Sequence, residues 1–252
     1  MQSRFFKQFI YGIFYLIIFS GIGYGIYIFG IQSVASCFDN RLNQSEEEVD
    51  CGGVCQPCAL KQLQSIQVSK VNLVFADRSI SALVEFKNFN TDFGADRLAY
   101  EFKFYGFQGD ELAVFRRETF IYPGEIKIIA EINLPVNQTL IARAEATAMP
   151  ISWKSAAEFS VPQTQIRDVR TVFSNRQAVI TGLLVSKDAA VISRAVITAA
   201  IFNEFDKPTS VSETLVENIA PFAERPFTVI IPDVDSQEIA ESDLQIFSEV
   251  AY

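Results

Sequence analysis

The uncharged stretch from Phe9 to Ile31 constrains this chain more than any other feature of its sequence. It runs for 23 residues, thirteen of which are Ile, Leu or Phe. As a helix rising about 1.5 Å per residue, it would be about 34 Å long, enough to cross the hydrocarbon core of a bilayer. Burial of these side chains in lipid favours insertion by about 5 kcal/mol. The sequence therefore predicts one transmembrane helix over residues 9–31.

Basic residues on either side of this stretch set its expected orientation. Arg4 and Lys7 precede it, and the next basic residue is Arg41. Because the cytoplasmic flanks of membrane helices carry the excess of Lys and Arg, we expect residues 1–8 in the cytoplasm and residues 32–252 outside the cell membrane. The protein would then be single-pass, with the apolar stretch in contact with membrane lipid.

Two other interpretations of the apolar stretch stay open. A cleaved signal peptide has an apolar core of about 7–15 residues, which is shorter than this one. A lipoprotein signal is the second, because Val34-Ala35-Ser36-Cys37 resembles a bacterial lipobox, in which Cys37 would be lipidated instead of disulfide-bonded. The length of the stretch favours a retained anchor.

Two glycines in the stretch have the spacing that lets membrane helices approach closely. Gly21 and Gly25 form a G-x-x-x-G pattern, and small residues four apart bring helix backbones together. They are the candidate residues for transmembrane packing and self-association. Because glycine is common in membrane helices generally, the pattern alone does not establish a dimer.

Composition argues against several classes of function. The 252 residues carry a net charge of −9, with a pI of about 4.7. This disfavours nucleic acid as a partner, because a phosphate backbone is bound by basic surfaces. Histidine is absent, which removes the commonest general base, the Ser-His and Cys-His nucleophile pairs and His-ligated metals. We expect no enzyme activity, no catalytic residues, no metal and no cofactor.

The four cysteines lie within 22 residues, at Cys37, Cys51, Cys55 and Cys58. Outside the cell, such clustering indicates two disulfides that staple a segment, here residues 32–62, that is too small for a hydrophobic core. Each disulfide contributes about 2–4 kcal/mol. Three pairings are possible, and the sequence does not choose among them. A four-thiolate zinc site is the competing interpretation, but the spacing is unusual for zinc and an exported segment is oxidised.

The run from Cys37 to Cys58, CFDNRLNQSEEEVDCGGVCQPC, resembles a short exported motif, C-x-D-G-x-x-N-x-x-E-x-x-x-D-C-G-G-x-C-x-x-C. The motif occurs in secreted or membrane-anchored proteins, often bacterial ones, and the resemblance implies an extracellular segment. Asn40 stands where the motif has glycine. Since asparagine tolerates positive φ better than other residues, the turn can survive this change.

Acidic and amide side chains in the same segment allow two interpretations. Asp39, Asn43, Glu47 and Asp50 offer oxygen ligands of the kind that Ca²⁺ prefers. They equally suit a solvated acidic turn in which side chains cap backbone N–H groups. The absence of EF-hand spacing favours the second interpretation.

From residue 66 onward, alternation with a period of two replaces helical patterns. The clearest strand is 126–134, which we expect to be half-buried and antiparallel. One face of it carries Ile126, Ile128, Ala130, Ile132 and Leu134, and the other carries Lys127, Ile129, Glu131 and Asn133.

The same pattern recurs about 97–98 residues later. Phe104 corresponds to Phe202, Pro123 to Pro221, and residues 81–88 to residues 179–186. Each copy has about 90 residues and six or seven short strands, which is typical of an immunoglobulin-like β-sandwich. We therefore predict a mainly β chain with two tandem sandwiches, over residues 63–161 and 166–252, joined by a polar, proline-containing segment.

The second copy resembles the FxLYD-type β-sandwich domains of exported bacterial proteins. The resemblance rests on VITGLLVS at 179–186, AAIFNEFD at 199–206 and PFTVIIP at 226–232. The first copy matches more loosely, and both copies depart from the central Leu-Tyr-Asp of the family. The resemblance implies a structural or binding module of the cell envelope and transfers no site residues.

These observations predict a membrane-anchored, extracytoplasmic and non-enzymatic protein. It would present a binding or scaffolding surface at the cell envelope to a protein or cell-surface partner, whose identity the sequence does not give. The alternative is a structural subunit of a larger membrane or cell-surface assembly.

Overall fold

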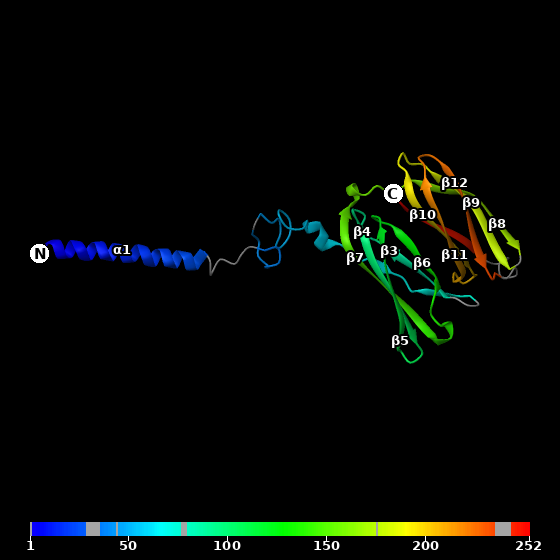
Figure 1. Ribbon diagram of the computed structural model, residues 1–252, viewed down its shortest axis with the longest axis horizontal. Helices are drawn as coiled ribbons and strands as arrows, with labels where there is room; N and C mark the ends of the chain where they lie inside the picture. The colour runs from blue at the N-terminus through cyan, green and yellow to red at the C-terminus, as the bar shows by residue number, and fades with distance from the viewer. Residues whose placement is uncertain (1, 29–35, 44, 77–79, 175, 235–242) are drawn as a thin grey trace. The chain divides into compact units, whose positions relative to one another are not determined.

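The computed structural model of the 252 residues describes all of them except 1, 29–35, 44, 77–79, 175 and 235–242. The chain separates into two compact units, Met1–Gln62 and Leu63–Tyr252. The first contains an apolar helix and a disulfide-bonded segment, and the second contains the thirteen described strands, β1 to β13 (Figure 1). The expected fold class is confirmed: the chain is mainly β, with immunoglobulin-like sandwiches in tandem.

The helix α1 extends from Gln2 to Ile26. Its segment Phe6–Ile26 is long and apolar enough to cross a membrane, and none of that segment is buried within the chain. The helix begins before Phe9, where the apolar stretch was expected to start, because residues 2–8 contain no glycine or proline that would stop it. Residues 29–31, the end of the expected span, lie outside the described residues.

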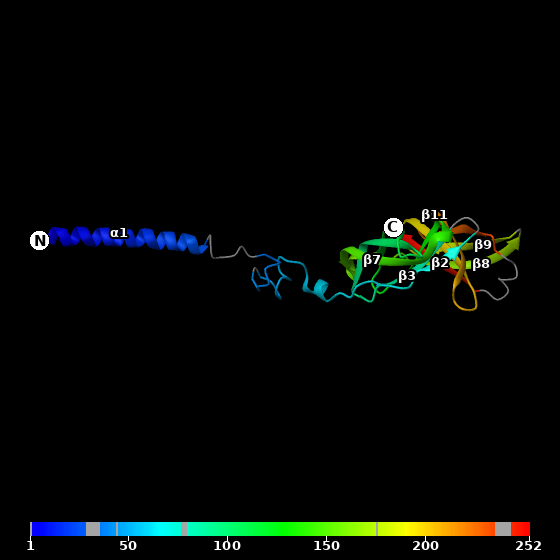
Figure 2. The same cartoon turned by 90° about the horizontal axis from the view of Figure 1, so that it is seen from below.

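Strands of the first sandwich form two facing sheets (Figure 2). In the β3 sheet, β3 pairs on one side with β6 and on the other with β1 and β2. In the β4 sheet, β4 lies between β5 and β7. The strands are β1 (Gln67–Val68), β2 (Asn72–Phe75), β3 (Ile80–Lys87), β4 (Phe93–Gly106), β5 (Glu111–Ile121), β6 (Ile126–Leu134) and β7 (Ile141–Ser155).

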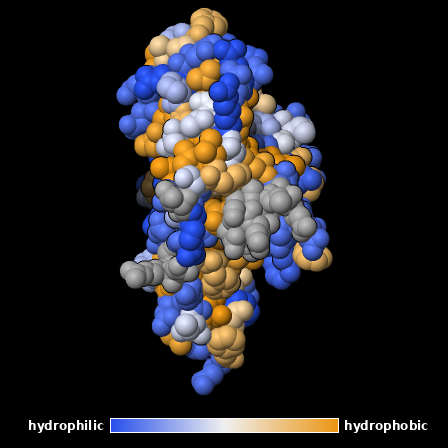
Figure 3. Space-filling model, turned by 90° about the vertical axis from the view of Figure 1, so that its right-hand side faces the viewer, coloured by the Kyte–Doolittle hydropathy of each residue, from blue (hydrophilic) through white to orange (hydrophobic). Residues whose placement is uncertain are grey.

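The second sandwich repeats this arrangement. In the β9 sheet, β9 lies between β8 and β12, and in the β10 sheet, β10 lies between β11 and β13. Its strands are β8 (Thr164–Ser174), β9 (Gln177–Ser186), β10 (Ile192–Phe202), β11 (Pro208–Ile219), β12 (Glu224–Pro232) and β13 (Asp243–Ala251). Short 3₁₀ helices lie at Cys58–Gln62 (η2), Gln138–Leu140 (η3) and Ala156–Glu158 (η4). Apolar and hydrophilic surface is intermixed on the side seen in Figure 3.

Strand register shows that the two sandwiches are copies of one design. In the first sandwich, Lys87 of β3 pairs with Ile126 of β6. In the second, Val185 of β9 pairs with Glu224 of β12, and these two residues lie 98 positions after Lys87 and Ile126 respectively. The turn between β5 and β6 also matches the turn between β11 and β12. Gly124 and Phe222, also 98 apart, both adopt positive φ, +66° and +53°. The repeat seen in the sequence is thus a repeat of backbone geometry.

The exact spacing varies because the first copy contains a bulge. Asn133, at φ +55°, lies where the pairing of β3 with β6 shifts by one residue. A similar slip makes the correspondence of Phe104 with Phe202 wrong by one position. Phe104 is fully buried inside the first sandwich, whereas Phe202 belongs to a different cluster and Ile201 packs inside the second sandwich. One residue of slip reverses the face on which a strand side chain lies.

A third apolar cluster joins the two sandwiches. Leu83 on the β3 sheet and Phe202 and Val211 on the β10 sheet are its buried members, together with Val74 and Ala200. Side chains of β6 pack against it, namely Ile128, Ala130 and Ile132. The second unit therefore has two internal cores and a shared one between them.

This packing corrects the expectation that β6 is half-buried. Its isoleucine face contacts the cluster between the sandwiches, while Ile129 on the other face belongs to the core of the first sandwich. Lys127, on the same face as Ile129, is only 3% exposed. A sequence pattern of one apolar and one polar face did not reveal that a second sandwich covers the strand.

Candidate functional site

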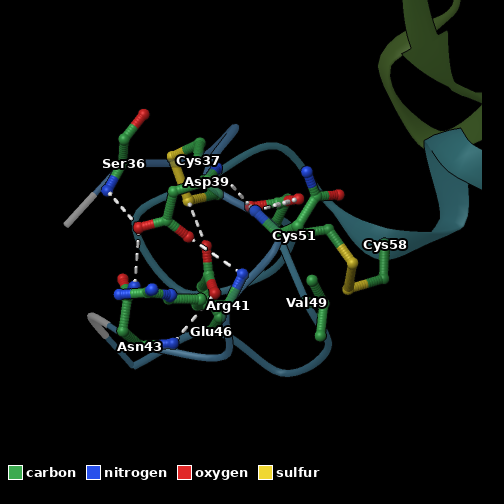
Figure 4. Close-up of a disulfide and its surroundings, with 12 residues drawn as sticks. Ser36, Cys37, Asp39, Arg41, Asn43, Glu46, Val49, Cys51 and Cys58 are labelled. Atoms are coloured by element: carbon green, nitrogen blue, oxygen red, sulfur yellow. Dashed lines mark hydrogen bonds between the residues drawn. A yellow bond between two sulfur atoms is a disulfide. The ribbon is translucent and has the colours of Figure 1, made fainter. Parts of the chain in front are cut away.

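The four cysteines of the disulfide-bonded segment, which were expected to form two disulfides, pair as Cys37–Cys55 and Cys51–Cys58. Figure 4 shows the second bond beside the turn that carries Asp39. Two donor clusters of this segment combine cysteine sulfur with a glutamate. Because the sulfurs are bonded to each other, they are not thiolates and do not offer metal ligands.

Carboxylates of the same segment cap backbone groups. Asp50 accepts hydrogen bonds from the backbone N–H groups of Asp39, at 2.9 Å, and of Asn40, at 3.0 Å. Asp39 accepts from the backbone of Arg41 and the side-chain amide of Asn43, both at 2.9 Å. The hydrogen bond from Asn43 is the largest of several contacts that hold the pKa of Asp39 below its usual value. These contacts are those of the capped acidic turn, the second of the two interpretations above.

Asn40 and the two glycines after Cys51 have backbone conformations that explain the motif. Asn40 has φ +57°, the region in which the motif places glycine. A Cβ on Gly52 would lie 2.6 Å from Cβ of Glu47, and one on Gly53 would lie 2.1 Å from the carbonyl oxygen of Ser45. The Cys-Gly-Gly sequence is therefore required by close backbone packing in this segment.

Gly21 and Gly25 lie on α1, and a Cβ built on either meets no described atom within 4 Å. The surface around them is open to another helix. No described residue of the chain occupies it.

A cleft of about 650 Å³ lies where the two sandwiches meet. One wall comes from β5 and β6 of the first sandwich, and the other from β10, β11 and β13 of the second. Charged side chains from both walls line it, namely Arg117, Glu118, Glu125, Lys127, Glu131, Arg194, Glu213 and Glu249. It is the strongest candidate for a binding site in the second unit.

Lys127 lies at the junction of the walls. Its ammonium is 3.4 Å from the ring centroid of Phe120, 3.5 Å from Oε1 of Glu249 and 4.0 Å from Oε1 of Glu125. Among the described residues, its Nζ donates no hydrogen bond. Burial lowers the pKa of Lys127, and the two carboxylates only partly counteract this. The ammonium is therefore held between the two sandwiches by its ion pairs with Glu249 and Glu125 and by its position over the ring of Phe120.

The surrounding carboxylates differ in their environments. Burial raises the pKa of Glu125, whose carboxylate accepts the backbone N–H of Tyr122 at 2.6 Å. Glu131 accepts the hydroxyl of Tyr100 at 2.8 Å. Glu213 stands at the rim, where partial removal from water, and then the charge of Glu131, raises its pKa. The cleft thus presents acceptors from both sandwiches.

Sequence reasoning missed this cleft. It assigned Lys127 to the polar face of a half-buried strand, whereas Lys127 and Arg117 both line the cleft. Arg116 pairs instead with Glu101 on the outer face of the β4 sheet. The available signal was the isoleucine face of β6, which is more apolar than a solvated strand face requires.

Comparisons with known proteins give no family. No family model matches the chain, and no curated protein matches it. Among solved structures, the crystal structure of red sea bream transglutaminase is similar over 77% of this chain and 32% of that chain, with 10% identity and a TM-score of 0.22. The present chain therefore spans about a third of that protein, and a likeness this distant carries no argument about activity.

Proposed function

We propose that this protein is a single-pass membrane protein that holds its paired sandwiches outside the cell membrane as a non-enzymatic binding or scaffolding surface. The observation that carries the proposal is the apolar helix. None of the segment Phe6–Ile26 is buried within the chain, although its mean hydropathy is 1.8 and Lys7 is its one charged residue. Exposure of so large an apolar surface to water is unfavourable, so lipid is its natural surrounding.

The rest of the chain supports an exterior location. Two disulfides persist in oxidising compartments and are rare in the cytosol. Arg4 and Lys7 on the N-terminal side of the helix favour a cytoplasmic N-terminus. The shared cluster holds the sandwiches as one compact unit, which suits presentation of a fixed surface.

Cross-linking in intact membranes, followed by affinity purification of the full-length protein, tests this function. The proposal expects a cross-linked protein or cell-surface partner that is retained when Gly21 and Gly25 are replaced by leucine. Loss of every cross-link in that variant would instead favour the alternative, a subunit whose helix docks into a larger assembly. Turnover of a substrate by the purified protein alone would contradict the non-enzymatic role.

A further inference from the structure

We propose that two copies of this chain associate through the outer face of the β9 sheet, the side of that sheet turned away from the core of the second sandwich. The inference goes beyond the proposed function, because the face is formed by the second sandwich alone. Strand register places its apolar side chains on one surface, namely Val172 on β8, Val179, Leu183 and Val185 on β9, and Pro226 and Ile230 on β12.

Strand β9 is apolar on both of its faces. Its inward side chains, such as Ile180 and Leu184, belong to the core of the second sandwich. Its outward side chains include Val179, Leu183 and Val185. An antiparallel strand with one face in water alternates apolar and polar residues, whereas a strand that is apolar on both sides is typical of burial on both sides. The sequence of β9 therefore indicates that something covers its outer face.

Within the chain this face is exposed. Val172 is 61% exposed and Ile230 is 49% exposed, and both lie in one cross-strand row with Val179. Exposed apolar side chains that are contiguous on one surface mark interaction sites more often than scattered ones do. The cover that β9 requires must therefore come from outside the described part of the chain.

The first sandwich shows what kind of surface covers such a face. Val74 lies 98 positions before Val172, and Ile132 lies 98 positions before Ile230. Both pack in the shared cluster, against side chains of the β10 sheet. Val74 is only 5% exposed as a result. In this backbone design, the outer face of the β3-type sheet is thus covered by the outer face of a sheet from another sandwich.

Two substitutions between the copies make the exposed face the more apolar one on β9. Glu85 and Lys87 of the first sandwich correspond to Leu183 and Val185 of the second, again 98 positions later. A face that stayed in water would be expected to gain charges relative to its covered counterpart, and here it loses them. The β9 sheet is therefore suited to a partner surface that is itself apolar.

A second copy can offer that surface only through its own β9 sheet. The outer face of the β10 sheet is already covered by the first sandwich. The outer face of the β4 sheet carries ion pairs, Arg97 with Glu118 and Arg116 with Glu101, so a head-to-tail array is disfavoured. Contact of the β9 sheet with itself is isologous and closes at two copies.

The face is complementary to itself about a twofold axis parallel to β9. This axis sets β9 of one copy over β9 of the other, so Val179 and Leu183 each meet their own equivalents. It also sets β8, which carries Arg167 and Arg170, over the strand of the other copy that carries Glu224. Apolar residues then meet apolar residues, and the arginines do not face each other.

The size of the face suits a dimer that is assisted by the membrane. Its five cross-strand rows lie about 6.8 Å apart on three strands about 4.8 Å apart, which gives a face of about 14 by 34 Å. Two such faces bury about 1,000 Å² together, the lower limit for a specific interface. The proposed anchoring of both copies in one membrane by α1 would raise their effective concentration.

Cross-linking of the full-length protein in its membrane tests the interface. Thr181→Cys places one reactive thiol at the exposed centre of the face, since the four native cysteines are all in disulfides. A short bis-maleimide should join two copies, because the two thiols face each other across the axis. In that background, Leu183→Arg should lower the yield of covalent dimer about tenfold or more, because it sets like charges against each other. Val172→Arg changes a side chain that is 61% exposed, so it tests the face even if Leu183→Arg unfolds the protein.

Matched controls separate this face from other surfaces. Met149→Arg introduces the same charge at a methionine that is 70% exposed on the outer face of the β4 sheet, and it should leave the yield unchanged. Replacement of both Gly21 and Gly25 by leucine should also leave it unchanged. Glu204→Cys, in the exposed turn before β11, should give no covalent dimer.

Several results would overturn the proposal. They are the absence of a covalent dimer from Thr181→Cys, an equal yield from Glu204→Cys, attachment of Thr181→Cys to a different protein, and a yield that survives both arginine substitutions. Loss of the dimer in Met149→Arg would assign it to a head-to-tail contact, and loss in the glycine variant would assign it to α1. None of these results would affect the membrane topology, on which the proposed function depends.

Discussion

The ammonium of Lys127 lies 3.5 Å from the carboxylate of Glu249, and this contact joins the two sandwiches across their interface. Glu249 also accepts the hydroxyl of Thr119 at 2.8 Å, so β13 of the second sandwich is tied to both β5 and β6 of the first. Tyr122 adds a hydrogen bond to the backbone carbonyl of Val250 at 3.1 Å. Polar contacts thus reinforce the shared apolar cluster.

Removing the charge of Glu249 should destabilise the second unit. Glu249→Gln keeps an oxygen for Thr119 but leaves the ammonium of Lys127 without its nearer carboxylate, and we expect a loss of about 2 kcal/mol, below the full value for a buried pair because Glu249 is partly exposed. Urea unfolding measures the loss. The double variant with Lys127→Met should lose less than the sum of the single variants, and strictly additive losses would contradict the coupling.

The shared cluster should make a large contribution to stability. Phe202→Ala removes a ring that is 8% exposed, and we expect a loss of about 3 kcal/mol. Phe205→Ala is the matched control, because this ring is 71% exposed in the neighbouring turn and its loss should cost about 0.5 kcal/mol or less. Similar losses in the two variants, measured by denaturant titration, would show that the sandwiches do not pack as described.

The disulfide pairing can be read directly by peptide mapping without reduction. We expect fragments that join Cys37 to Cys55 and Cys51 to Cys58. Reduction should destabilise the segment of residues 36–62 by about 2–4 kcal/mol for each bond. Recovery of another pairing, or of lipid on Cys37, would contradict the structure of this segment.

Burial of Glu125 predicts a specific dependence of stability on pH. Burial raises its folded-state pKa above the ordinary value of 4.5, so the folded protein binds a proton more tightly than the unfolded chain does. Stability from this group is full below 4.5 and falls as the pH rises through the raised pKa. Relative to Glu125→Gln, the wild type should lose melting temperature between about pH 4 and about pH 7. A constant difference between the two proteins over this range would contradict the burial of Glu125.

The sequence predicted the presence of helices and strands better than the residues at which they begin and end. Strand β6 has the expected bounds of 126–134. Helix α1, by contrast, begins at Gln2 rather than at Phe9. Strand β4 begins at Phe93, after a turn that the side-chain amide of Asn88 closes by donating to the carbonyl oxygens of Phe93 and Tyr122. Strand β7 continues through Pro150 to Ser155. It pairs on one side only, with β4, and an edge strand tolerates a proline.

The cleft could not be predicted because it depends on long-range packing. Lys127 and Glu249 come from different copies of the repeat, and nothing local to either residue indicates the other. The β4 sheet of the first sandwich and the corresponding β10 sheet of the second also differ in their outer faces. The β4 sheet carries charged pairs such as Arg116 with Glu101, whereas the β10 sheet carries Phe202 and Val211. This difference between the two faces, together with the isoleucine face of β6, is the part of the interface that the sequence does indicate.

Labelling of intact cells with a membrane-impermeant maleimide tests the central claim most directly. The four native cysteines are all in disulfides, so a cysteine introduced at the exposed Glu204 and one introduced at Ser3 report separately on the two sides of α1. The account predicts that Glu204→Cys is labelled in intact cells and that Ser3→Cys is labelled only after lysis. Labelling of Ser3→Cys in intact cells, with Glu204→Cys protected until lysis, would contradict it.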